Sequence, residues 1–166
     1  LELKKHFMHC DFIIAGVEAL GQDYYQSFLK DSNISVIFNN TYHLFEEADA
    51  ALVSSGTATL ETALFYVPQV VCYESSWVSF NIAKRLVNLK YISLVNLIAD
   101  REVVRELIQE DLTVSNMVNE LNRLLTKYGV EKMHLEYRKI ESLLGGTGAS
   151  ERVANSIFKE LIEAKS

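Results

Sequence analysis

Short runs of apolar and β-branched residues alternate, as far as residue 94, with longer segments whose apolar positions recur at helical spacing. This alternation predicts successive βα units and therefore a parallel sheet, because parallel strands need crossover connections. Each expected strand is almost wholly apolar, which is typical of strands buried on both faces. The expected strands are 12–15, 34–38, 50–53, 69–73 and 91–94.

Helical periodicity fills the gaps between these strands and continues alone after residue 94. The expected helices are 22–30, 42–47, 57–66 and 78–87, then one near 114–125 with Thr113 as its N-cap, and a last one over 153–162. Gly145-Gly146-Thr147-Gly148 precedes the last helix and resembles an anion-binding loop, but it lacks a preceding strand and the dinucleotide spacing. A helix C-cap followed by a turn is the favoured interpretation.

Length and charge narrow the class of protein. The 166 residues allow one domain, here predicted as Rossmann-like α/β over about 1–110 with a helical tail over 111–166. A net charge of −6 argues against nucleic acid as a partner, although a local basic pocket is still allowed. No apolar run or leader suggests a membrane span or signal peptide, so a cytosolic protein is expected. Because the chain opens at Leu1, we expect a fragment of a longer protein.

The cysteines and histidines do not form a metal-ligand pattern. Cys10 and Cys72 follow no CxxC or Cys/His spacing, and we expect both to be reduced thiols in or near the core. The four histidines are scattered, and no cluster of carboxylates or cysteines completes a site around the His6 and His9 pair. The sequence therefore predicts no metal.

The segment 48–64 carries the clearest chemistry. An apolar strand runs into Ser55-Gly56-Thr57 and then directly into a helix. In an open α/β sheet, ligands bind outside the carboxyl ends of the strands, where helix N-termini present free N–H groups. Gly56 allows close approach to the backbone, and the hydroxyls of Ser55, Thr57 and Thr59 are candidate donors to phosphate. The alternative is that one serine simply caps the helix.

Glu61 favours the ligand interpretation. A capping box requires the acid three residues after the capping hydroxyl, but the residue at that spacing is Ala58. Glu61 instead lies four residues after Thr57, one turn into the helix on the same face. A carboxylate one turn into the helix is far enough from a diphosphate at the helix end not to repel it. It can accept hydrogen bonds from both hydroxyls of a ribose attached to that diphosphate. The pair predicts a nucleotide site.

Several spaced blocks, taken together and in order, resemble lipid-A-disaccharide synthase, an inverting glycosyltransferase of the two-domain GT-B type. The resemblance is closest over 34–125, and many members of that family have Pro and Gly where this chain has Val95 and Asp100. The blocks are 55–61 (SGTATLE), 68–73 (PQVVCY), 83–86 (AKRL), 91–98 (YISLVNLI), 101–102 (RE) and 106–109 (ELIQ).

The resemblance implies the C-terminal, donor-binding half, without the N-terminal acceptor domain. The reaction it implies transfers diacylglucosamine from UDP to the 6-hydroxyl of diacylglucosamine 1-phosphate, without a cofactor or metal. It adds Asn96, Arg101, Gln109 and Tyr42 to the expected UDP-sugar contacts, with Arg101 as the preferred ion partner of the diphosphate. Asn96 and Gln109 are equally interpretable as structural bridges, and Tyr42 as an ordinary residue at a helix start.

No catalytic residue is expected in this chain, because the resemblance places the general base and most of the lipid-acceptor surface in the missing domain. The whole enzyme is expected to contact the inner face of the cytoplasmic membrane peripherally. Lys84 and Arg85, beside Trp77 and Phe80, suggest either an interfacial patch or ordinary helix packing.

Two other classes of protein are alternatives to this assignment. One is another UDP-sugar enzyme, such as UDP-N-acetylglucosamine 2-epimerase or the undecaprenyl-linked muramyl-peptide glucosaminyltransferase; more glycine and proline would be expected in its loops. The other is a non-catalytic flavodoxin-like module, which would need acids clustered at strand ends. Asp11 and Asp49 instead precede their strands.

Overall fold

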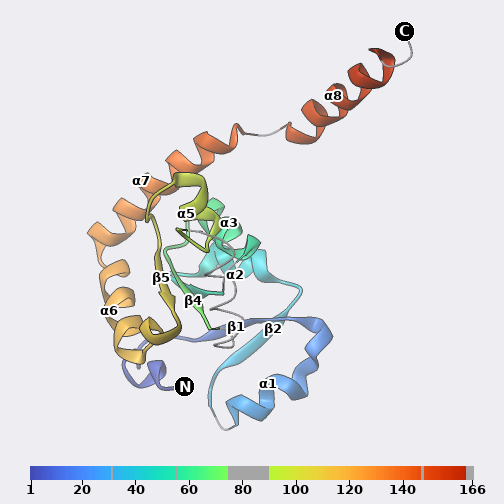
Figure 1. The fold of residues 1–166 in the computed structure, drawn as a ribbon. Coiled ribbons are helices and arrows are strands. Elements are labelled where there is room, and N and C mark those ends of the chain that lie inside the picture. The colour runs from blue at the N-terminus through green and yellow to red at the C-terminus, as the bar shows by residue number, and fades with distance from the viewer. Residues whose placement is uncertain (31, 55, 75–89, 147, 164–166) are drawn as a thin grey trace.

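The computed structural model describes residues 1–30, 32–54, 56–74, 90–146 and 148–163 (Figure 1). Its strands form two parallel sheets. One pairs β1 with β2, and the other has the order β3-β4-β5. Helices flank these sheets, so the predicted α/β class with parallel pairing is confirmed. The strands are β1 (Ile13–Gly16), β2 (Ser35–Phe38), β3 (Ala51–Val53), β4 (Gln69–Tyr73) and β5 (Arg105–Ile108).

The predicted helices that fall on described residues occur in the predicted order, whereas α5 and α7 were not predicted as separate helices. The helix predicted over 78–87 lies outside the described residues. The short 3-10 helices are η1 (Leu3–Lys5), η2 (Glu18–Leu20) and η3 (Gln109–Asp111). The α-helices are α1 (Gly21–Leu29), α2 (Thr41–Glu47), α3 (Thr57–Leu64), α5 (Leu94–Ala99), α6 (Val114–Leu124), α7 (Lys127–Leu144) and α8 (Ala149–Glu163).

The first four predicted strands lie within one residue of those observed, but the fifth, 91–94, was wrong. Ser93 is the N-cap of α5, and its hydroxyl accepts a hydrogen bond from the Asn96 N–H at 3.3 Å. The N–H groups of Ile92 and Ser93 donate to the Glu106 carboxylate at 3.0 and 2.9 Å. Because a side chain takes these backbone donors, the segment leads into a helix, and β5 supplies the fifth strand instead.

The hydrophobic core lies between the three-stranded sheet and the helices around it. Before Ala51, the only buried residue among those described is Leu3. The helical segment predicted after residue 110 divides in two, since α6 and α7 contribute to this core whereas α8 extends away from the body of the molecule (Figure 1). The core residues are Ala63, Val70, Val71, Val95, Val104, Leu107, Leu124, Met133, Tyr137 and Ile140.

Two predicted helix caps and one of the predicted thiols fit this packing. The Thr113 hydroxyl accepts the Asn116 N–H at 3.1 Å, which confirms it as the N-cap of α6. Gly145 ends α7 with a φ of 76°, in the left-handed conformation that favours glycine, and this confirms the C-cap. Both cysteines are free thiols and Cys72 is partly buried, but Cys10 is exposed, so its predicted burial was wrong.

Candidate functional site

The turn between β3 and α3 exposes backbone at the carboxyl end of a strand. Gly56 is the N-cap of α3 and has a φ of 104°, in the left-handed half of the backbone map. A Cβ atom added to Gly56 would meet nothing within 4 Å, so its outer side is open. Gly56 and Thr57 are both exposed, whereas Ser55 lies outside the described residues. The first N–H groups of α3, which have no partner within the helix, therefore face an accessible turn.

Thr59 supports this turn from below. Its side chain is fully buried, and its hydroxyl donates to the Gly56 carbonyl at 2.8 Å. A hydroxyl has a single hydrogen to donate, so Thr59 in this conformation holds the turn and has no donor left for a ligand. The Thr59 carbonyl in turn accepts from the Gln69 side-chain amide at 2.9 Å, and the same amide contacts the buried hydroxyl of Tyr137 at 3.2 Å.

Glu61 and Gln109 lie toward the edge of the sheet formed by the carboxyl ends of the strands, as the glycine turn does. Glu61 is half-buried and one turn into α3. The parallel register aligns Val53 with Val71, and Tyr73 with Ile108, so the strand ends share one edge. Gln109 follows β5 directly and therefore belongs to the edge that carries Gly56 and Thr57.

Asn96 is found at the opposite, amino edge of the sheet, where it ties α5 to the start of β5. It is fully buried, and its side-chain carbonyl accepts the N–H groups of Val103 and Val104 at 2.7 and 2.9 Å. Its amide donates to the Val104 carbonyl at 2.8 Å and to the Glu106 carboxylate at 2.9 Å. Of the two predicted interpretations, this geometry supports the structural bridge.

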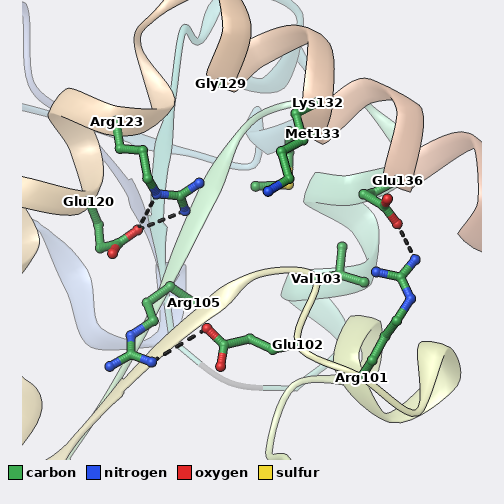
Figure 2. A pocket seen from close by; sticks show the side chains of 10 residues that line it. All are labelled: Arg101, Glu102, Val103, Arg105, Glu120, Arg123, Gly129, Lys132, Met133 and Glu136. Atoms are coloured by element: carbon green, nitrogen blue, oxygen red, sulfur yellow. Dashed lines mark hydrogen bonds and ion pairs between the residues drawn. The ribbon is translucent and has the colours of Figure 1, made fainter.

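Arg101 also lies at the amino edge, in the loop that leads into β5. Its guanidinium forms an ion pair with Glu136 of α7 in the close-up of Figure 2. Lys139 donates to the other oxygen of Glu136 at 2.9 Å. Burial alone would raise the pKa of Glu136, but the hydrogen bonds and positive charges of Lys139 and Arg101 lower it below 4.5. The structure thus does not bring Arg101 to the glycine turn.

Tyr42 lies near the far end of α3. Its ring stacks on that of Phe65, with 5.3 Å between centroids and 13° between planes. Phe65 is the C-cap of α3, whereas Gly56 is its N-cap. Tyr42 and the glycine turn are therefore separated by the length of the helix.

Sequence reasoning missed the central role of Glu106. Its carboxylate also accepts the Ser93 hydroxyl at 2.7 Å, in addition to two backbone N–H groups and the Asn96 amide. The signal was present, because an acidic residue directly before the apolar pair Leu107 and Ile108 needs such partners when it is drawn into the packed part of the sheet. The blocks 91–98 and 106–109, two of those that carry the family resemblance, therefore form a joint between α5 and β5.

Metal-ligand clusters and membrane-spanning helices are both absent from the described part of the chain. It contains no group of three or more His, Cys, Asp and Glu side chains able to hold a metal ion. None of its helices combines the length and the apolar character that crossing a membrane requires. The predicted basic and aromatic group of Lys84, Arg85, Trp77 and Phe80 lies outside the described residues.

A parallel α/β domain with an open glycine turn before a helix has the architecture of a broad class of ligand-binding proteins. Comparison with known proteins identifies the family within this class. The family model for lipid-A-disaccharide synthetase matches residues 1–158. The chain therefore belongs to this family, as its motifs predicted.

Lipid-A-disaccharide synthases from three bacteria illustrate the similarity. The one from Geobacter metallireducens is 31% identical over 162 residues, which is 96% of this chain and 42% of that protein. The Anaeromyxobacter dehalogenans (strain 2CP-C) protein is 37% identical over 126 residues, covering 75% of this chain and 33% of the relative. The Psychromonas ingrahamii protein is 44% identical over 100 residues, covering 60% and 26%. The match thus spans between about a quarter and two fifths of the relatives' length.

Proposed function

We propose that this chain binds the nucleotide-sugar donor of a lipid-A-disaccharide synthase. The donor is UDP-diacylglucosamine, and the reaction is an inverting transfer of its sugar to diacylglucosamine 1-phosphate, which forms a β-1,6 disaccharide and UDP. The observation that carries the proposal is the open Gly56 turn at the N-terminus of α3, with the Glu61 carboxylate one turn further in. Family membership supports the substrate class.

The proposed chemistry follows from the positions of these groups. The diphosphate lies against the free N–H groups of Thr57 and Ala58 at the positive end of the helix. The ribose extends along the helix, and Glu61 accepts its hydroxyl hydrogens. As the sugar leaves, negative charge grows on the diphosphate, and the fixed N–H groups stabilise that charge without having to reorganise.

The remaining predicted contacts fall into three groups: direct contacts, residues that hold the backbone, and residues left out of the proposed site. Gln109 joins the proposed direct contacts, because it belongs to the edge of the sheet that carries the turn. Ser55, which lies outside the described residues, stays a proposed contact because it precedes Gly56 in the sequence. Thr59 and Asn96 act through the backbone they hold. Arg101 and Tyr42 are left out, since their described partners are Glu136 and Phe65.

Transfer itself requires groups outside these residues in the proposed scheme. The attacking hydroxyl needs a general base, and the resemblance assigns that base and the lipid acceptor to the other half of the enzyme. We propose that the whole enzyme works at the cytosolic face of the membrane by peripheral contact. The 166-residue chain is expected to bind UDP without forming disaccharide, and synthesis by the purified chain would contradict this division.

The donor site is tested by calorimetric titration with UDP, UMP and ADP. UDP is expected to bind more tightly than UMP, and both more tightly than ADP. A ligand present at ten times its dissociation constant stabilises the folded chain by about 1.4 kcal/mol. Thermal shifts with the three nucleotides therefore give a second measurement.

A matched pair of variants makes the test specific. Glu61→Gln removes the carboxylate and is expected to weaken UDP binding by about tenfold, because a charge-assisted hydrogen bond is lost. Glu131→Gln makes the same change at an exposed site on α7 and is expected to leave UDP affinity unchanged. Equal affinity for the three nucleotides, or equal effects of the two variants, would refute the donor site.

A further inference from the structure

A second polar feature lies at the amino edge of the sheet, in a cleft of about 390 Å³ between the start of β5 and the helices α6 and α7 (Figure 2). This volume falls in the range of small-ligand sites, roughly 300–1,000 Å³. Four cationic and three acidic side chains line the cleft. Its excess of positive charge is unusual in a chain whose net charge is −6.

The cations of this cleft reach it from different elements, and each retains N–H donors. Arg123 of α6 uses Nε and one terminal nitrogen on Glu120, at 2.9 and 2.7 Å. Arg105 of β5 meets Glu102 through a single nitrogen at a long 3.4 Å. A guanidinium has five N–H donors, so both arginines have donors to spare.

Lys132 of α7 is the exposed cation of the cleft that forms no ion pair with the described residues. Among the described residues its ammonium has no hydrogen-bond or ion-pair partner, and the stick view shows it extending toward the same open space as Arg123 (Figure 2). The nearby Glu136 is already shared by Arg101 and Lys139. The carboxylates of the cleft are thus paired with other cations, and Lys132 is left over.

The corner between α6 and α7 fixes these groups in place. A Cβ atom on Gly129 would lie 2.2 Å from the Arg123 carbonyl and 2.9 Å from the Leu124 carbonyl. The first turn of α7 therefore packs directly against the last turn of α6. Since backbone contacts hold the corner, Arg123 and Lys132 line the cleft from rigid elements.

We propose that this cleft binds a phosphate ester, with Lys132 and Arg123 as its principal contacts and Arg105 as a third donor. A tetrahedral oxyanion accepts hydrogen bonds in several directions at once, which suits donors converging from α6, α7 and β5. The carboxylates of the cleft partly offset the attraction of its arginines for an anion. The Lys132 ammonium, which forms no such ion pair, is therefore the principal contact of the phosphate. The cleft opens at the amino edge of the sheet, whereas the proposed donor turn lies at the carboxyl edge.

The two proposals are tested separately by following backbone amide signals in NMR spectra of the full 166-residue chain. Glycerol 3-phosphate and inorganic phosphate are the probes for the cleft. They are expected to shift the signals of Gly129 and Lys132 and to leave those of Thr57 and Ala58 unchanged. UDP is expected to shift the signals of Thr57 and Ala58, so either site can fail without the other.

Lys132→Gln provides the decisive variant, because it removes an unpaired charge and leaves no buried partner behind. It is expected to weaken phosphate-ester binding in the cleft about fivefold to tenfold. Lys127→Gln removes an exposed lysine from the start of the same helix and is expected to change affinity less than about twofold. Equal losses in the two variants, or no shift at Gly129 and Lys132 with either probe, would overturn the proposal.

Vesicle sedimentation distinguishes a lipid headgroup from a soluble ester as the source of the phosphate. Phosphatidylcholine vesicles with and without phosphatidic acid are compared. If the headgroup is the ligand, phosphatidic acid increases sedimentation of the native chain and of Lys127→Gln but not of Lys132→Gln. If the shifts at Gly129 and Lys132 occur with glycerol 3-phosphate and the vesicles have no effect, the ligand is a soluble phosphate ester.

Discussion

The two sheets differ sharply in how their side chains are held. In the unit formed by β3, β4, β5 and the helices α3, α5, α6 and α7, buried apolar residues are accompanied by polar groups that are almost all hydrogen-bonded. In the unit formed by β1, β2 and α1, no residue of α1 is buried, and Tyr24 and Phe28 are exposed. The comparison shows that repeating βα units are enough to form both sheets. A long-range polar network around Asn96 and Glu106 distinguishes the unit that contains β3, β4 and β5.

The largest effect is expected from breaking that network at Asn96. Asn96→Ala leaves the N–H groups of Val103 and Val104 without acceptors and removes a donor from Glu106. We expect the free energy of unfolding to fall by about 4 kcal/mol, measured by urea denaturation. Asn116→Ala, at a half-buried position whose amide makes one solvent-exposed hydrogen bond, is the matched control and should cost about 1 kcal/mol or less. Similar losses for both would mean that the network is not what distinguishes this unit.

Apolar truncation in each unit gives the next largest difference. Ile140 is 1% exposed and lies in the core, whereas Phe28 is 61% exposed. Ile140→Ala is expected to destabilise the fold by about 3 kcal/mol, because it loses burial and leaves a cavity. Phe28→Ala removes a larger side chain and is expected to cost less than about 0.5 kcal/mol. Urea midpoints measured side by side decide the matter, and a loss at Phe28 equal to that at Ile140 would contradict the comparison.

Glycine substitutions sharpen the contrast at the level of the backbone. Gly129→Ala places a Cβ atom 2.2 Å from a carbonyl oxygen in the packed unit, and we expect a loss of about 2 kcal/mol. Gly21→Ala meets no atom within 4 Å and carries only the strain of its φ of 72°, which costs about 1 kcal/mol. Thermal unfolding of both variants tests the order. A Gly129→Ala variant as stable as the parent would show that the α6–α7 corner adjusts freely.

The smallest expected effect is the response to acid at Glu136. Its pKa is held below 4.5, so its carboxylate stabilises the fold above that value, and this contribution is lost as the pH falls through the lowered pKa. The free energy of unfolding of the native chain drops when the pH is lowered from neutral into the range where Glu136 takes up a proton. In Glu136→Gln this drop is expected to be smaller, by less than about 1 kcal/mol. Urea unfolding at several pH values measures it, with Glu102→Gln, from the exposed Arg105 pair, as the control. An unchanged pH dependence in Glu136→Gln would refute this role.

Local patterns were sufficient where a residue's neighbours in sequence determine its structure. The Thr113 and Gly145 caps are of this kind, because their contacts lie within a few residues. The run of β4 was predictable from its apolar, β-branched composition alone, although its strand partners β3 and β5 are distant in the sequence. The place of Gly56 and Thr57 at the start of α3 was also predictable, since a strand followed by small residues and a helix fixes this junction at the edge of the sheet. The direct ligand contacts proposed there stay predictions.

Long-range pairing explains what the sequence could not indicate. Residues 91–94 look like a strand, but Glu106 takes up their backbone donors from beyond the next helix. Arg101 was predicted as the ion partner of a diphosphate, whereas in the structure it pairs with Glu136, 35 residues later. Neither pairing leaves a periodic trace in the sequence.

The two cysteines differ in burial, and their chemistry differs accordingly. Burial raises the pKa of the Cys72 thiol to about 11, so at pH 7 only about one molecule in ten thousand carries the reactive thiolate there. Cys10 is exposed, in the segment before β1. Brief treatment with a maleimide dye should therefore label Cys10 and spare Cys72. The native chain thus offers a single reactive attachment point for a fluorophore, in the exposed segment that leads into β1.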